Sequence, residues 1–161
     1  MNSKNKERME LLKRKSRRNN LVKELSNYID VSIDSFVEIS KNDTFCKDVF
    51  QKLSTIQNKY IIQGENYKQN IELSKAHLIK LGKEICFDRD LAQVFFYGDH
   101  EIESLMLNIH DVLTNLDIIL EKSGFSSGHG DFVLVSDDLS FGICIERTEY
   151  FYEFSTWGLS K

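Results

Sequence analysis

The sequence predicts an α+β fold in which a helical N-terminal two-thirds packs on a C-terminal three-stranded antiparallel β-meander. Over residues 131–157, β-branched and aromatic residues alternate with small or polar ones, and two polar dipeptides interrupt the alternation. Before this stretch, apolar residues recur mainly at steps of three or four, which is typical of helices. A chain of 161 residues suits one domain, which we divide into a basic leader (1–19), a helical region (20–122) and the meander (131–157).

Four amphipathic helices are expected within the helical region. They cover residues 20–39, residues 43–64, residues 66–85 and residues 100–122. The last one has the clearest apolar stripe at about 100° per residue, although Leu107 and Ile118 fall on its polar side. Residues 86–98 fit either a short helix or an edge strand, because Val94 to Tyr97 favours β-structure, and we favour the helix. Residues 123–130 form a glycine-rich loop.

The meander has a definite predicted register. If Asp137-Asp138 and Thr148-Glu149 are two-residue turns, Leu134 faces Phe141 and Ile145 faces Tyr152. Both hairpins then place the same apolar set on one face: Phe132, Leu134, Phe141, Ile143, Ile145, Tyr152 and Phe154. A slip of one residue would scatter this set over both faces, so the agreement supports the meander and identifies its core side.

The opposite face of the meander is the predicted contact surface for a partner. Glu146 and Glu153 flank Phe151 there, and Trp157 stands beside small residues, an arrangement of aromatic anchors rimmed by acid. Asp137 and Asp138 in the first turn complete the set of expected partner-binding residues. The alternative is that another helix or the leader covers this face.

Charge divides the chain into two unequal parts. Residues 1–23 contain nine Lys or Arg and two Glu (net +7), which leaves 12 basic and 23 acidic residues in 24–161 (net −11). An acidic surface favours cationic partners through long-range attraction. The leader either binds nucleic acid phosphates or is a solvated helix that docks on the acidic body; its candidate phosphate contacts are Lys13, Arg14, Lys15, Arg17 and Arg18.

Catalytic and metal-binding motifs are weak. His129 and Asp131 resemble a base and its orienting carboxylate, but their glycine-rich loop leads into a strand and no Gly-Lys-Ser element follows. His100 and Glu103 lie at i and i+3 and supply only two ligands of a helical metal site. We therefore expect no catalytic residue, no metal site and no cofactor.

Cysteine usage and hydropathy point to a soluble cytoplasmic protein that has no membrane partner. No apolar run approaches the length of a membrane span, and the charged N-terminus is not followed by an apolar signal core. The three cysteines are odd in number and widely spaced, so we expect reduced thiols at Cys46, Cys86 and Cys144.

The C-terminal quarter contains a hairpin from Ser136 to Glu146 and then an aromatic strand. It resembles the immunity proteins that protect bacteria from polymorphic toxins, including the immunity proteins of contact-dependent inhibition systems. The resemblance implies a non-enzymatic inhibitor that binds a cognate toxin domain, often a nuclease, whose cationic cleft an acidic surface blocks. The alternative is a nucleic-acid-associated regulator that uses the basic arm. The oligomeric state stays open.

Overall fold

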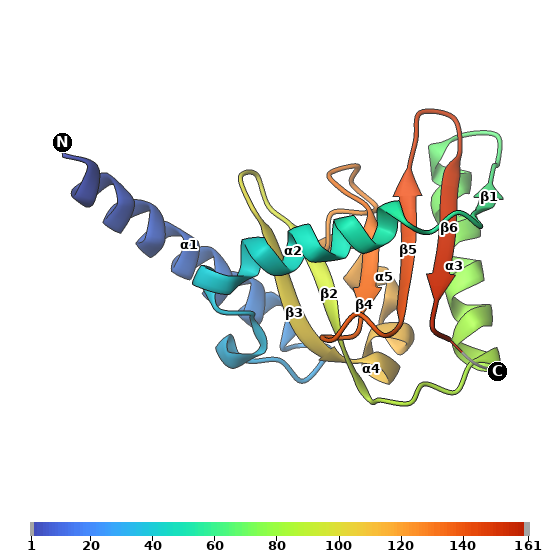
Figure 1. Ribbon diagram of the computed structural model, residues 1–161, viewed down its shortest axis with the longest axis horizontal. Helices are drawn as coiled ribbons and strands as arrows, with labels where there is room; N and C mark the ends of the chain where they lie inside the picture. Colours follow the sequence, from blue (N-terminus) through green and yellow to red (C-terminus); the bar gives the residue numbers. More distant parts are fainter. Residues whose placement is uncertain (1, 160–161) are drawn as a thin grey trace.

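The computed structural model describes residues 2–159 as a six-stranded antiparallel sheet with helices on both faces (Figure 1). The strands follow the order β1-β6-β5-β4-β2-β3 across the sheet. Their bounds are β1 Tyr60–Ile62, β2 Leu91–Tyr97, β3 Ile102–Asn108, β4 Phe132–Val135, β5 Gly142–Arg147 and β6 Tyr152–Trp157. The helices are α1 Ser3–Leu25, the 3-10 turn η1 Ile33–Ser35, α2 Ile39–Ser54, α3 Tyr67–Glu84, α4 Ile109–Thr114 and α5 Leu116–Lys122.

The predicted three-stranded meander is therefore wrong in extent, because three further strands come from the part of the chain predicted to be helical. β2 pairs with β3 along seven residues and also with β4, which places it inside the sheet. The short helix favoured for residues 86–98 is thus incorrect, and the strand propensity of Val94 to Tyr97 prevails. The predicted 43–64 helix instead begins at Ile39 and ends at Ser54, and Tyr60–Ile62 pairs with β6.

The predicted helix over residues 100–122 is replaced by β3, α4 and α5. Leu105, Leu107 and Ile109, all buried in the larger core, stand at every second position, so the same segment also fits the period of a strand. Leu107, which did not fit the helical stripe, is buried in the core beside β2. This misfit was the sequence signal that favoured the strand.

The predicted 20–39 helix is also wrong, whereas the 66–85 helix is confirmed as α3, which Asn66 caps. α1 ends at Leu25, and the chain then turns through a stretch rich in Ser, Asn and Asp. Ser32 and Ser35 bond to nearby backbone amides there, which competes with helical hydrogen bonding. Phe36 forms a bridge to Leu105 at the outer edge of β3.

The two faces of the sheet support two separate cores. The larger core joins α1, α3, α4 and α5 to the sheet, and it contains the predicted core face of the meander, including Phe132, Leu134, Ile143 and Tyr152. The smaller core lies under α2, which crosses the other face in front of the strands in Figure 1. No helix within residues 2–159 is both long and apolar enough to cross a membrane.

Both hairpins differ from the predicted register by two residues. Leu134 pairs with Ile143, and Ile145 pairs with Phe154. The first turn needs the additional residues because it spans Asp137 to Ser140, with Leu139 in the left-handed region at φ 63°. A shift of two residues leaves every side chain on its face, so the assignment of residues to the two faces holds although the pairing does not.

Gly142 provides a test of the packing between β5 and β6. A Cβ atom at this position would overlap the ring of Trp157, so Gly142→Ala should lower the free energy of unfolding by about 1–3 kcal/mol through overpacking. Urea denaturation measures the loss. Gly98→Ala is the control, because its Cβ would lie 3.4 Å from the nearest atom, the carbonyl oxygen of Glu101. Equal losses in the two variants would contradict this packing.

Candidate partner-binding site

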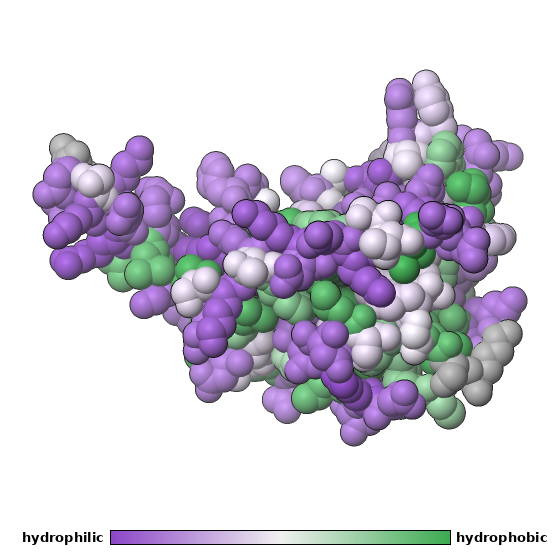
Figure 2. Space-filling view, in the orientation of Figure 1, coloured by the Kyte–Doolittle hydropathy of each residue, from purple (hydrophilic) through white to green (hydrophobic). Residues whose placement is uncertain are grey.

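An open groove of about 830 Å³ is bounded by α1, α2 and the turn between β2 and β3. Its apolar lining comes from Leu11, Ile39, Phe50 and Ile102, and charged side chains from both helices surround these residues. Figure 2 shows hydrophobic surface along the projecting part of α1 and beneath α2, between hydrophilic side chains. An apolar floor with a charged rim is the usual composition of a protein-binding surface.

α1 forms one side of this groove. The lining residues Lys6, Glu10, Arg14 and Arg17 repeat at steps of four and three, so they lie along one side of the helix together with Leu11. Residues 3–13 are all exposed, and α1 projects away from the sheet toward the N-terminus (Figure 1). The position of the groove therefore depends on how the second half of α1 is held.

Ion pairs hold the middle of α1 against the sheet, whereas apolar packing of Leu21, Val22 and Leu25 holds its C-terminal end. The only buried residues of the helix are Arg18 and Leu25. Arg14 Nε lies 2.6 Å from Glu103 Oε1, and Arg18 Nη2 lies 2.5 Å from Glu103 Oε2. The Arg18 guanidinium also stacks 4.6 Å from the centre of the Phe36 ring. Two arginines thus flank a single carboxylate on β3, and one aromatic ring stacks on the second arginine.

This anchor carries an excess of positive charge. Arg14 Nη2 and Arg18 Nε have no hydrogen-bond acceptor among the described residues, although both atoms are buried. One carboxylate compensates two guanidinium groups, so loss of that carboxylate would leave two uncompensated cations. Arg17, which is more exposed, pairs with Glu101 at 2.7 Å on the turn that closes the groove.

The predicted phosphate-binding residues are therefore divided between two roles. Arg14, Arg17 and Arg18 dock α1 on the acidic body, whereas Lys13 and Lys15 are exposed. Lys13 makes only a surface contact of 3.7 Å with Glu10. Three arginines of the leader thus act inside the molecule, and the two lysines remain available to a partner.

The predicted contact face of the meander is largely covered by α2. The Trp157 indole Nε1 donates a hydrogen bond to the Leu139 carbonyl oxygen at 3.0 Å and packs against the smaller core. Glu146 and Glu153 both pair with Lys59, at 3.1 and 3.3 Å, and the hydrogen bond to Glu146 is the main cause of the raised Lys59 pKa. Phe151 is half-buried.

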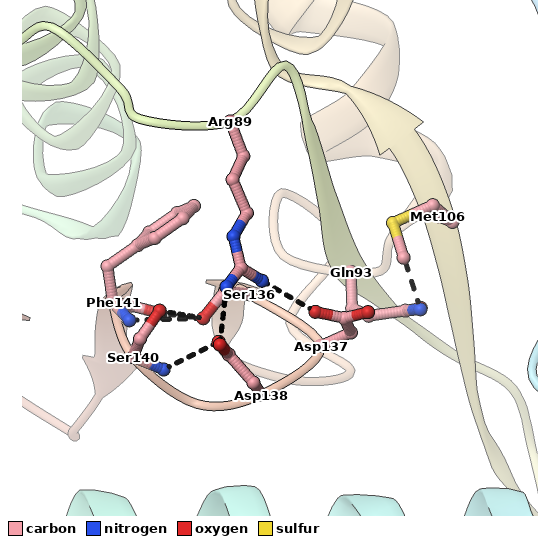
Figure 3. Close-up of polar contacts among 8 residues, drawn as sticks. All are labelled: Arg89, Gln93, Met106, Ser136, Asp137, Asp138, Ser140 and Phe141. Carbon is pink, nitrogen blue, oxygen red and sulfur yellow. Dashed lines mark hydrogen bonds and ion pairs between the residues drawn. The ribbon is translucent and has the colours of Figure 1, made fainter.

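Asp137 and Asp138 are likewise engaged within the chain (Figure 3). Arg89 Nη1 donates to Asp137 at 2.8 Å, and the other guanidinium nitrogen pairs with Asp138. Hydrogen bonds from Ser140 and from Arg89 hold the pKa of Asp138 below its usual range. These contacts brace the long first turn against the segment before β2. We therefore place the partner-binding surface elsewhere.

The structure does not assemble the weak catalytic motif. His129 Nδ1 hydrogen-bonds to Ser127 Oγ at 2.7 Å, whereas Asp131 accepts from the backbone amide of Arg147 at 2.8 Å. Burial raises the pKa of Asp131, and the hydrogen bond from the Arg147 amide ties the loop to β5. Of the two residues at metal-ligand spacing, for which no metal site was expected, His100 lines the groove and Glu103 binds arginines. The described residues include no cluster of three or more metal-ligating side chains.

A second recess, of about 400 Å³, lies near the opposite ends of β2 and β3. Asp30, Asp34 and Asp111 surround the apolar side chains of Leu91 and Met106. Every charged residue among those that line this recess within residues 2–159 is acidic. We call it the acidic recess.

Comparison with known families classifies the chain without describing its activity. Residues 21–157, well over half of the chain, match the family described as YxiF protein. The chain belongs to the YxiF family. Searches among curated proteins and among solved structures gave no match. The YxiF match includes Glu101 and Glu103, whereas the arginines that bind them precede its first residue.

The groove was not anticipated from the sequence of this YxiF-family protein. It joins residues of α1 to residues of α2 and of the β2–β3 turn, and the last of these was predicted to be helical. The available signal was Leu11, an apolar residue within a basic helix. Sequence periodicity alone does not show which element lies beside it.

Glu103→Gln tests the anchor of α1. The substitution keeps the size of the side chain but leaves the cations of Arg14 and Arg18 buried without a countercharge, so stability should fall by about 3–5 kcal/mol. Chemical denaturation followed by circular dichroism measures this loss. Glu101→Gln, which affects the more exposed pair with Arg17, should cost less than about 1 kcal/mol. An equal effect of both substitutions would show that Glu103 is not the anchor.

Proposed function

We propose that this YxiF-family chain is a non-enzymatic binding protein that neutralises a cognate bacterial toxin domain by direct contact through the groove. The groove is the observation that carries the proposal, because it combines an apolar floor with charged walls on a helix that ion pairs hold in place. The groove is open, which suits a protein segment better than an enclosed small ligand. The resemblance of the C-terminal hairpin to immunity proteins supports the same class of function.

Charge supports a cationic partner such as a nuclease domain. The net charge of −11 over residues 24–161 attracts a basic surface, whereas it opposes the approach of nucleic acid. Internal ion pairs neutralise Glu101, Glu103, Glu146 and Glu153, but the acidic recess retains its carboxylates. The expected mode of action is to cover the substrate cleft of the toxin and to compete with its anionic substrate.

The proposal predicts that this gene lies directly downstream of a gene for a large secreted protein, and the C-terminal domain of that protein is the partner for the test. Cells that produce this domain should survive when the full chain is co-produced. The purified chain should inhibit the domain in a linear titration that ends near one equivalent, as expected of a tight binder. Leu11→Glu, which places a charge in the groove, should weaken binding at least tenfold.

Leu12→Glu is the matched control for this experiment. It adds the same charge to the neighbouring residue, which does not line the groove, so protection and inhibition should be retained. Full inhibition at a small fraction of an equivalent would indicate turnover and contradict a binding mechanism. Equal activity of the Leu11→Glu chain and the unmodified chain would exclude the groove as the contact surface.

A second candidate function is nucleic acid binding through the first half of α1. The observation that favours it is the exposure of Lys4, Lys6, Arg8, Lys13 and Lys15 on the projecting part of the helix. Such clusters bind phosphates with a strong dependence on salt. Against it stand the three arginines already engaged by Glu101 and Glu103, and the acidic body behind the helix.

A further inference from the structure

The first half of α1 is exposed along its whole length, and only its inner side lines the groove. Residues 3–13, here called the arm, are all exposed, and Met9 and Leu12 retain 44% and 60% of their accessible surface. A helical segment of about three turns is marginally stable in water by itself, and exposed apolar side chains add no stability to it. Packing against a partner would therefore stabilise the helical conformation of the arm.

The arm has a second face, distinct from the one that lines the groove. At about 100° per residue, Met9 and Leu12 lie together on the side away from Glu7 and Arg14. Basic residues flank this pair on both sides: Arg8 and Lys15 on one side, Lys6 and Lys13 on the other. We call this apolar pair with its basic rim the outer face of the arm.

The acidic recess has the complementary composition. Leu91, which is 49% exposed, and Met106 provide an apolar centre, and Asp30, Asp34 and Asp111 provide an acidic rim. The outer face of the arm presents apolar residues within a basic rim, and the recess presents apolar residues within an acidic rim. Two arms packed against each other by their outer faces would instead place Lys against Lys or Arg, which is unfavourable.

The arm cannot reach the recess of its own molecule. α1 is continuous from Ser3 to Leu25, and about 24 Å of helix separates Met9 from Leu25. The residues that line the recess begin at Asp30, shortly after the C-terminal end of α1, whereas the arm projects from the other end (Figure 1). The chain therefore carries both halves of a contact that only two molecules can form.

We propose that two copies of the chain associate by exchanging arms, so that the outer face of each arm docks in the acidic recess of the other copy. Both halves lie at the same edge of the sheet, because the anchor residue Glu103 and the recess residues Met106 and Asn108 all belong to edge strand β3. A two-fold axis at this edge would place each arm opposite the other recess. The interface is then self-complementary and closes at two copies.

Sedimentation velocity of the full chain tests the exchange. A dimer is expected at low salt, and its dissociation constant should rise as added salt screens the contact between the basic rim and the acidic rim. Leu12→Glu and Asp34→Lys should each raise that constant at least tenfold. Leu11→Glu, on the groove side of the arm, should leave the dimer intact. Circular dichroism confirms that each variant is folded.

Cross-linking shows whether the arm meets the recess. Leu12→Cys and Leu91→Cys chains, both with Cys86→Ser to remove the exposed native thiol, are mixed and treated with a short bismaleimide. The mixture should yield a covalent heterodimer, whereas neither chain alone should cross-link. A chain that is monomeric at all concentrations, or a dimer unaffected by both Leu12→Glu and Asp34→Lys, overturns the proposal. Binding of a DNA duplex by a purely monomeric chain would assign the arm to nucleic acid instead.

The exchange does not depend on the proposed toxin-neutralising function, because self-association is measured without a toxin. The two neighbouring leucines separate the outcomes. Leu11→Glu should weaken toxin binding and retain the dimer, whereas Leu12→Glu should weaken the dimer and retain toxin binding. Failure of one proposal therefore leaves the other intact.

Discussion

Glu103 lies on the edge strand β3 with its carboxylate between Arg14 and Arg18, and the position of α1 depends on this contact. Apolar packing attaches only the C-terminal end of α1, through Leu21, Val22 and Leu25, so the ion pairs fix the helix farther toward its N-terminus. Charge-assisted contacts have stricter geometry than apolar ones, because donors and acceptors must be aligned. The buried cluster thus sets the direction in which the first three turns of the helix leave the body, and with it the shape of the groove.

α2 has the corresponding role on the opposite face of the sheet. It covers Phe95, Val133 and Cys144, and it confines Trp157 to the rim of the smaller core. The acidic and aromatic residues that suggested a contact patch are thereby drawn into internal contacts, with Lys59 pairing both glutamates. A sheet face of mixed composition can be either a half-covered core or a binding surface. The position of the covering helix distinguishes the two.

The arm combines two surfaces on one helix. Its inner side, with Leu11, completes the groove, and its outer side, with Met9 and Leu12, has a basic rim. The acidic recess at the other end of β3 has the opposite rim. The chain is basic at the N-terminus and acidic beyond it. In the fold, these basic and acidic residues form separate surfaces that face different directions. Among the described residues, Arg14, Arg17 and Arg18 join the basic N-terminal segment to carboxylates of the acidic body.

The sequence by itself determined the mixed α+β class, helix α3 and the two faces of the last three strands, because these depend on local periodicity and on the parity of side chains along a strand. It did not determine the six-stranded sheet, since Ile102–Asn108 satisfies both helical and strand periods and pairing with β2 selects the strand. Neither the groove nor the ion pairs of Glu103 could be predicted from the sequence. Arg14 and Glu103 are 89 residues apart, and their attraction acts only after the sheet has placed them side by side.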